Sequence, residues 1–242
     1  MIKLMHGDCL ELMKEIPDNS IDMVLTDPPY GTTACKWDSV IPFEPMWIEL
    51  KRITKDNGAI CLFGSEPFSS ALRMSNIKQF KYDWYWNKLK PSTGLHAKIM
   101  PLKNLEIVSV FYRSKCLYSP VMSKCKLRIE DKNDSNGEAF GGKKIKRHHN
   151  NGGLKYPKHL IEFSNANQKD RLHPTQKPVP LLEYLIKTYT LENETVLDFT
   201  MGSGSCGVAA KNLNREFIGI EKDDKYFKTA ENRITQHTRE IK

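Results

Sequence analysis

The segment Asp27-Pro28-Pro29-Tyr30 places a carboxylate, two prolines and an aromatic ring directly after an apolar run, Ile21 to Leu25. The Asp27 carboxylate can accept one N–H of an aromatic amine. The Pro28 carbonyl can accept the other, because consecutive prolines fix the backbone and donate no N–H. The Tyr30 ring offers a face on which a base taken out of its duplex can stack. These groups suit the activation of a base amine toward a methyl donor, although the same residues also fit a simple turn.

A glycine-containing motif lies late in the chain, between an expected strand and an expected helix: Asp198-Phe199-Thr200-Met201-Gly202-Ser203-Gly204. Glycines at such a turn let the backbone approach a bound ligand closely. Glu221 ends the next expected strand, where a nucleoside-binding α/β fold places a carboxylate for the ribose hydroxyls. A dinucleotide site remains open for this motif alone, although Gly207 lies off the usual glycine spacing.

A third motif, His173-Pro174-Thr175-Gln176-Lys177-Pro178, stands before the helix that precedes the glycine turn. Pro178 suits the first position of a helix. Taken alone, the motif is a helix-entry loop. Its place one helix before a nucleoside site makes it a candidate part of that site.

The elements that must position these motifs alternate short apolar strands with amphipathic helices, which predicts parallel α/β units. The expected strands are Lys3–His6, Ile21–Leu25, Ala59–Phe63, Phe80–Trp86, Leu105–Tyr112, Thr195–Phe199 and Phe217–Glu221. The expected helices are Leu10–Ile16, Phe43–Ile53, Pro67–Ile77, Pro178–Tyr189, Ser205–Leu213 and Asp223–Gln236. Asn57-Gly58 is expected to turn the chain into the third strand.

Between these two blocks the helical and strand periodicity fails and the composition turns basic. Residues 113–160 hold 12 Lys/Arg and 4 Asp/Glu, whereas the rest of the chain holds 25 of each sign. A local excess of positive charge is typical of a polyanion-binding surface, although a solvated basic loop has the same composition. We therefore expect one α/β domain, residues 1–113 and 171–242, split by a loop-rich insertion at 114–170.

The overall composition, 39% hydrophobic and 27% charged over 242 residues, is ordinary for a globular protein. No apolar run approaches the roughly 20 residues of a membrane span, which predicts a cytoplasmic protein. Cys116, Cys125, His148 and His149 match no regular zinc spacing, so no metal is expected.

The order of the three motifs resembles the β group of S-adenosylmethionine-dependent DNA amino-methyltransferases, in which the catalytic motif comes first and the cofactor motif follows the recognition region. The resemblance covers roughly residues 1–112 and 170–237. It implies a Rossmann-like class I methyltransferase fold, a mainly parallel sheet with helices on both faces. One departure stands in the cofactor motif, where the family commonly has Asp-Pro-Phe and this chain has Asp198-Phe199-Thr200.

The resemblance also implies residue roles. Asp27, Pro28, Pro29 and Tyr30 would hold and activate the flipped base. Cofactor-binding positions would be Asp8 near the adenine, Glu221 at the ribose, Thr175 and Lys177 near the carboxylate, Gly202 and Gly204 beside the methionine part, with Asp198, Thr200 and Ser203. The insertion would recognise DNA, with Arg128, Lys143, Lys144, Lys146 and Arg147 as contacts.

The expected activity is methyl transfer from S-adenosylmethionine to N6 of adenine in double-stranded DNA. Asp27 favours adenine, because cytosine enzymes of this family more often carry Ser at that position. N4 methylation of cytosine uses the same amine chemistry and is the alternative. An RNA methyltransferase and an inactive DNA-binding relative are further alternatives, and the short insertion allows a homodimer.

Overall fold

The computed structural model describes residues 1–33, 35, 38–91, 97–125, 153–165 and 176–236. The chain divides into two compact units, Met1–Ser119 with His159–Lys242, and Pro120–Lys158. In the smaller unit, β6 (Ser123–Lys124) and β7 (Leu154–Lys155) pair in an antiparallel ladder. All other helices and strands described below belong to the larger unit.

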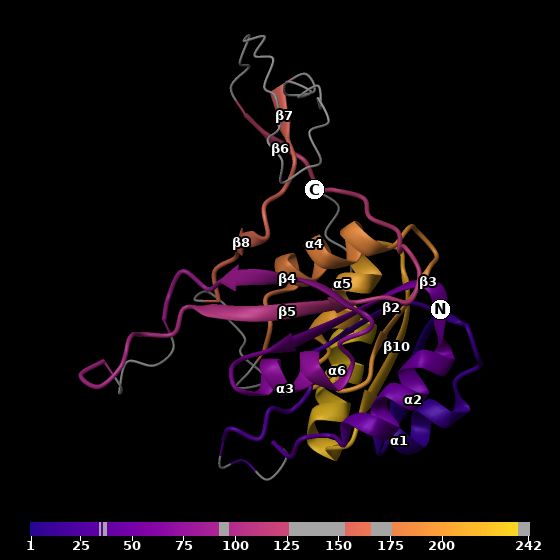
Figure 1. Cartoon of the computed structure of the whole chain (residues 1–242). Coiled ribbons are helices and arrows are strands. Elements are labelled where there is room, and N and C mark those ends of the chain that lie inside the picture. The colour runs from indigo at the N-terminus through magenta and orange to yellow at the C-terminus, as the bar shows by residue number, and fades with distance from the viewer. Residues whose placement is uncertain (34, 36–37, 92–96, 126–152, 166–175, 237–242) are drawn as a thin grey trace. The chain divides into compact units, whose positions relative to one another are not determined.

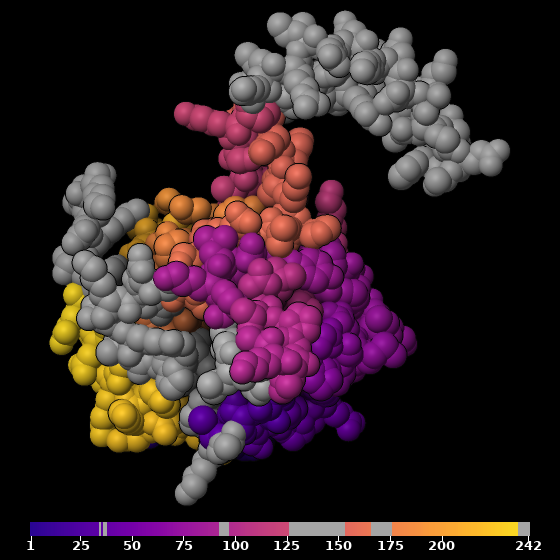
Figure 2. Space-filling model, turned by 90° about the vertical axis from the view of Figure 1, so that its left-hand side faces the viewer, coloured from indigo at the N-terminus to yellow at the C-terminus, as the bar shows by residue number. Residues whose placement is uncertain are grey.

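The larger unit contains an eight-stranded sheet in the order β1-β10-β9-β2-β3-β5-β4-β8. Its strands are β1 (Ile2–His6), β2 (Ile21–Thr26), β3 (Thr54–Gly64), β4 (Phe80–Asn87), β5 (Leu105–Phe111), β8 (Leu160–Glu162), β9 (Thr195–Asp198) and β10 (Glu216–Glu221). In Figure 1 the orange-to-yellow strands of the C-terminal block lie beside the violet strands of the N-terminal block. Figure 2 shows orange and violet segments of the two blocks against each other on one face.

Helices cover both faces of this sheet. They are α1 (Cys9–Leu12), the 3-10 turn η1 (Met13–Glu15), α2 (Phe43–Ile53), α3 (Phe68–Ser75), α4 (Val179–Tyr189), α5 (Ser205–Asn212) and α6 (Asp224–Gln236). Neighbouring residues of a strand point to opposite faces. Accordingly, Leu25 packs with α4, α5 and α6, whereas Val24 packs with η1, α2 and α3. The expected mainly parallel sheet with helices on both faces is confirmed.

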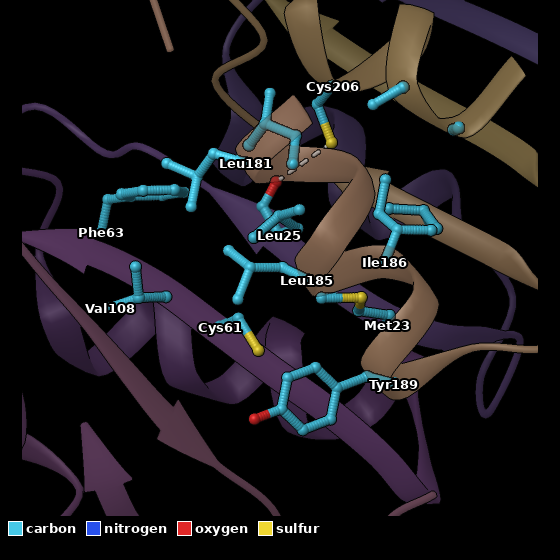
Figure 3. Close-up of a cluster of buried hydrophobic side chains, with 14 of the residues drawn as sticks. Met23, Leu25, Cys61, Phe63, Val108, Leu181, Leu185, Ile186, Tyr189 and Cys206 are labelled. Atoms are coloured by element: carbon cyan, nitrogen blue, oxygen red, sulfur yellow. Dashed lines mark hydrogen bonds between the residues drawn. The ribbon is translucent and has the colours of Figure 1, made fainter. Parts of the chain in front are cut away.

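The apolar face of α4 forms the centre of one core cluster. Figure 3 shows Leu181, Leu185, Ile186 and Tyr189 of α4 beside Met23, Leu25, Cys61, Phe63 and Val108 of the sheet. Cys206 of α5 donates its thiol to the Leu25 carbonyl at 3.6 Å. The end of β2 is therefore fixed by two helices from the C-terminal block.

The structure differs from the sequence prediction at several elements. β5 runs antiparallel to both β3 and β4, and the described residues between β4 and β5, 88–91 and 97–104, contain no crossover helix. β3 begins at Thr54, since Asn57 and Gly58 lie in an irregularity of its pairing with β2. The helix expected over Leu10–Ile16 is α1 followed by η1, ending before Pro17.

The limits of the middle region also differ. β8 lies inside the predicted insertion 114–170, yet it pairs in parallel with β4 of the main sheet, with Trp86 opposite Ile161. The smaller unit accordingly begins at Pro120 and ends at Lys158. Recognition of DNA by this region stays a prediction.

Across the described residues, no helix has the length and apolar character needed to cross a membrane.

Candidate active site

Four neighbouring parallel strands end at one edge of the sheet, and each carries a predicted site residue there. Asp8 follows β1, Glu221 ends β10, Gly202 follows β9 and Asp27 follows β2. The crossover from β9 to β10 uses α5 on one face, whereas that from β2 to β3 uses α2 on the other. The chain thus winds in opposite directions from β2 and β9, and ligands of open α/β sheets bind at such a switch point.

A cavity of about 760 Å³ lies at this edge. Its size is within the usual range for small-molecule sites. The predicted residues that line it are Asp8, Asp27, Pro28, Pro29, Tyr30, Lys177, Asp198, Thr200, Gly202, Ser203 and Glu221. The predicted base-activating and cofactor-binding motifs therefore share one cavity.

The Asp27 carboxylate has a hydrogen-bond donor on each oxygen. The Tyr30 hydroxyl donates to Oδ1 at 2.5 Å, and the Lys177 ammonium donates to Oδ2. The Tyr30 ring packs on Phe68, with ring centroids 5.0 Å apart. Burial, together with the Asp27 charge, holds the pKa of Tyr30 well above its usual value, so its hydroxyl stays a neutral donor. The motif therefore forms a fixed carboxylate beside a fixed aromatic ring.

Asp38 anchors the loop that carries Tyr30. Its Oδ1 accepts the backbone N–H groups of Tyr30 and Gly31 at 2.8 and 2.9 Å, and its Oδ2 accepts those of Thr32 and Thr33 at 2.9 and 2.7 Å. Burial alone would raise the pKa of Asp38, but the Thr33 hydroxyl and these N–H groups outweigh burial and lower that pKa. Sequence reasoning missed Asp38, whose signal was a lone carboxylate shortly after the Pro-Pro motif.

An ion-pair network continues from Asp27 into the sheet. Lys177 lies 3.4 Å from Glu106 Oε2 on β5, and Lys88 lies 3.1 Å from Glu106 Oε1. Burial alone would raise the pKa of Glu106, but the two ammonium groups outweigh it and lower that pKa. Burial alone would lower the pKa of Lys177, yet Asp27 and Glu106 raise it. Glu106 and Lys177 therefore carry opposite charges at neutral pH.

Thr26 joins the two central strands below the cavity. Its hydroxyl donates to Asp198 Oδ1 at 2.7 Å and accepts the Phe199 N–H at 2.9 Å. The Thr200 hydroxyl donates to the Asp27 carbonyl at 3.1 Å. Burial raises the pKa of Asp198 to about 7. These bonds fix the spacing between the Asp27 and glycine motifs.

The glycine turn is stabilised by Glu221. Gly202 has φ of +50°, in the left-handed region, and donates its N–H to Glu221 Oε2 at 2.9 Å. The Asp223 N–H donates to Glu221 Oε1 at 2.8 Å. Asp8 is held in a similar way, by the Leu10 N–H at 3.0 Å and the Lys222 ammonium at 3.0 Å. Both carboxylates are thus oriented at the cavity by backbone donors.

Comparison with protein families identifies the chain. A family model for N6 and N4 methyltransferases, described as DNA methylase, matches residues 21–232. The chain belongs to this family. It is a DNA methyltransferase that uses S-adenosylmethionine.

Relatives of this DNA methyltransferase match it over nearly its whole length. It is 29% identical to the type II methyltransferase M2.LlaDCHI of Lactococcus lactis subsp. cremoris, over 96% of this chain and 89% of the relative. It is 30% identical to M.HinfI of Haemophilus influenzae, over 99% of this chain and 68% of that protein.

Solved structures show the same fold. The complex of M1.HpyAVI with S-adenosylmethionine is 27% identical, with a TM-score of 0.67 over 97% of this chain and 99% of that one. The cytosine-N4-specific PvuII DNA methyltransferase is 18% identical, with a TM-score of 0.68 over 100% and 88%. At that identity the second likeness shows the fold alone. The class I methyltransferase fold expected from the sequence is thereby confirmed.

Gly204 of the methyltransferase differs from the other predicted residues because it does not line the cavity. Its φ is +77°, and a Cβ at this position would lie 3.0 Å from the Ala230 backbone of α6. The close approach of α6 to the turn gives this glycine a structural reason, and its place beside the ligand stays a prediction.

The cavity of the methyltransferase has further lining residues that sequence reasoning did not place there. They are Phe63, Trp86, Lys88 and Glu106. The sequence contained a partial signal for two of them. Trp86 on β4 and Lys88 just after it are two positions apart, a spacing that places side chains on the same face of a strand. Trp84 occupies the same alternation but donates its indole N–H to Tyr189 at 2.6 Å in the core. Only the three-dimensional structure shows that Trp86 lines the cavity and Trp84 does not.

Some predicted residues lie outside the described part of the methyltransferase. These are Thr175 and the DNA contacts Arg128, Lys143, Lys144, Lys146 and Arg147. His148 and His149 of the weighed zinc set also lie outside it. Within the described residues, no group of three or more His, Cys, Asp or Glu side chains is arranged to hold a metal.

Proposed function

We propose that this methyltransferase modifies N6 of adenine in double-stranded DNA. The observation that carries the proposal is the Asp27 carboxylate, oriented by Tyr30 in the same cavity as the glycine turn. Asp at this position favours adenine within the family, as argued from the sequence. The basic composition of residues 113–160 supports a polyanionic substrate.

At the end of the cavity that contains the glycine turn, we assign the binding of S-adenosylmethionine. The Glu221 carboxylate is oriented by two backbone N–H groups, which leaves lone pairs for ribose hydroxyls. Asp8 is placed beside it, at the end of the neighbouring strand. The anionic Asp8 and Glu221 suit a cationic ligand, so the residues fit this cofactor. When bound, it supplies an electrophilic methyl group.

At the Asp27 end of the cavity, we assign the target base. Asp27 accepts one N–H of the exocyclic amine and the Pro28 carbonyl accepts the other, while the base stacks on Tyr30. With the cofactor bound, the amine nitrogen would take its methyl group, and the methylated amine would then give up a proton to solvent. Positioning and polarisation of the amine supply the rate enhancement. No deprotonation before the attack is required.

The region around the smaller unit is assigned to DNA recognition, with Arg128, Lys143, Lys144, Lys146 and Arg147 contacting phosphates or bases. The composition of the segment supports this assignment. A homodimer and a cytoplasmic location remain parts of the proposal. The type II methyltransferase relatives support a role beside a restriction nuclease.

The test is transfer of a tritiated methyl group from S-adenosylmethionine to unmethylated genomic DNA. The DNA is then digested to nucleosides, and the labelled product is identified by mass. N6-methyladenine is the expected product. N4-methylcytosine would keep the amine chemistry and overturn the substrate, and cofactor binding without any product would favour another acceptor or an inactive binder.

A further inference from the structure

The Lys177 ammonium lies between two carboxylates, and one of them has an unfilled acceptor. Lys177 donates to Asp27 Oδ2 and lies 3.4 Å from Glu106 Oε2. Glu106 Oε2 is buried and accepts no hydrogen bond within the described part of the chain. A buried acceptor without a donor is destabilising. Its persistence beside a cation indicates that the donor arrives in another state of the enzyme.

The target amine provides a reason for such a second state. Both oxygens of Asp27 already have donors, so an amine that binds there must compete with one of them. Tyr30 is fixed, because its ring packs on Phe68 and its N–H is bound to Asp38. Lys177 has a second carboxylate within reach. It is therefore the donor that can move.

We propose that Lys177 is a positioning residue that holds Asp27 in the resting enzyme and moves onto Glu106 Oε2 when the target amine reaches Asp27. The inference rests on the proposed function, because it requires an amine as the incoming group. It also changes the role of Lys177, which the family resemblance placed near the cofactor carboxylate. Glu106 then becomes the receiving carboxylate, and Lys88 fixes its other oxygen at 3.1 Å.

Electrostatics explains why a cation is needed beside Asp27. Burial raises the pKa of the Asp27 carboxyl, the Glu106 charge raises it further, and Lys177 opposes both. Without the ammonium the pKa of Asp27 would rise further, and a protonated carboxyl is a poorer acceptor for an amine. The groups that face Asp27 are Tyr30 from its own loop, Glu106 from β5 with Lys88 behind it, Lys177 before α4 and Asp198 at the end of β9.

The test compares two substitutions that should move the pH dependence in opposite directions. Lys177→Met removes the cation, so the pKa of Asp27 should rise. Glu106→Gln removes the competing carboxylate, so Lys177 stays on Asp27 and the pKa of Asp27 should fall. At a fixed pH below that pKa, the rate changes about tenfold when the pKa changes by one. Single-turnover methyl transfer to unmethylated genomic DNA, measured against pH, gives the acid limb of each variant.

We expect the acid limb of Lys177→Met to move to higher pH, with activity recovering as pH rises. That of Glu106→Gln should move to lower pH, while its rate falls on the plateau because Lys177 is no longer drawn away. The acid limb of the double variant should lie between those of the two single variants. A role confined to folding would lower the rates without opposite shifts.

A second readout does not depend on activity. The carboxyl pKa of Asp27 is measured by ¹³C NMR without DNA, and its resonance is assigned with Asp27→Asn. Lys177→Gln replaces Lys177→Met if the latter does not fold, and cofactor binding is measured for each variant. The matched control, Lys228→Met, removes an exposed lysine paired with Asp224 on α6 and should leave both readouts unchanged.

Shifts in the same direction, or an Asp27 pKa unchanged by Lys177→Met, would overturn the inference. A wild-type enzyme that yields no methylated base would instead overturn the proposed function, and the NMR titration would still decide the role of Lys177.

Discussion

The two ends of the cavity are built in different ways. At the glycine-turn end, Asp8 and Glu221 are oriented mainly by backbone N–H groups from residues close to the same strand ends. At the Asp27 end, Asp27, Lys177 and Glu106 orient one another through side chains, and Lys177 lies 150 residues from Asp27 in the sequence. The first end is fixed by local backbone geometry. The second depends on particular side chains from β2, β5 and the start of α4.

Under the proposed assignments, the two ends of the cavity have different functions. An end made by backbone donors has one arrangement and suits a ligand bound in the same way in each cycle. An end made by mobile charged side chains can rearrange when a base arrives. Substitutions at the two ends should therefore change different kinetic constants.

Removal of the Asp27 carboxylate should have the largest effect. In Asp27→Ala the amine loses its acceptor, so kcat should fall by at least about a hundredfold, the scale of losing one oriented polar group. Equilibrium binding of S-adenosylmethionine, measured by calorimetry, should change little. If cofactor affinity and turnover were lost together, the separation of the two ends would be wrong.

Glu221→Gln tests the opposite end. The amide nitrogen cannot accept an N–H, so one of the two backbone bonds to Gly202 and Asp223 is lost. The KM for S-adenosylmethionine should rise about tenfold, the equivalent of about 1.4 kcal/mol. The value of kcat at saturating cofactor should stay near that of the wild type. A fall in kcat with an unchanged KM would assign Glu221 to the chemistry instead.

Asp38→Asn should have a smaller effect on rate and a clear effect on stability. The amide replaces one carboxylate oxygen with a donor, so bonds to the Tyr30 loop are lost at a cost of about 1.5–3 kcal/mol. Because the folded pKa of Asp38 is lowered, its contribution to stability is complete above the unfolded pKa of about 3.9.

That contribution is lost as pH falls through the folded value. Urea unfolding of both proteins at several pH values should therefore show a smaller acid dependence in Asp38→Asn. If both proteins lost stability equally as the pH falls, the group whose protonation destabilises the fold would be one other than Asp38. The rate of methyl transfer should fall severalfold, since Tyr30 is less well oriented.

Gly204→Ala should change function least. The left-handed backbone and the contact with α6 should destabilise the fold by about 1–3 kcal/mol. The cofactor dissociation constant should stay within about twofold, because Gly204 does not line the cavity. Gly202→Ala is the matched control, since Gly202 does line it and should lose affinity as well as stability. Equal losses of affinity in both variants would return Gly204 to the ligand site.

The glycine-turn end could be predicted well from the sequence, because its residues follow strands whose periodicity is clear. Asp8, Gly202 and Glu221 lie at strand ends that parallel pairing must bring together. Lys177 was placed near the site for a different reason, and its pairing with Asp27 was not foreseen. A pairing across 150 residues leaves no local pattern.

The same reasoning explains the other misses. Glu106 lies on the antiparallel strand β5, and its register opposite Trp86, a purely tertiary feature, brings it to the cavity. β8 is only three residues long, too short for periodicity to reveal, and its pairing with β4 is purely tertiary. Gly204 is a different case, because its motif spacing suits a ligand and its backbone conformation suits the contact with α6, so its role stays a prediction.

The pairing of β2 with β9 has a consequence for the synthesis of the protein. Thr26 and Asp198 are 172 residues apart, so a ribosome making about 5–20 residues per second completes β9 on the order of 10–30 s after β2. Until then one edge of β2 lacks its final partner, and β1 lacks β10. Asp27 lacks Lys177 for the first 150 of those residues. A nascent or truncated chain therefore cannot assemble this cavity, and an unpaired hydrophobic strand edge makes early release of the chain a risk for aggregation.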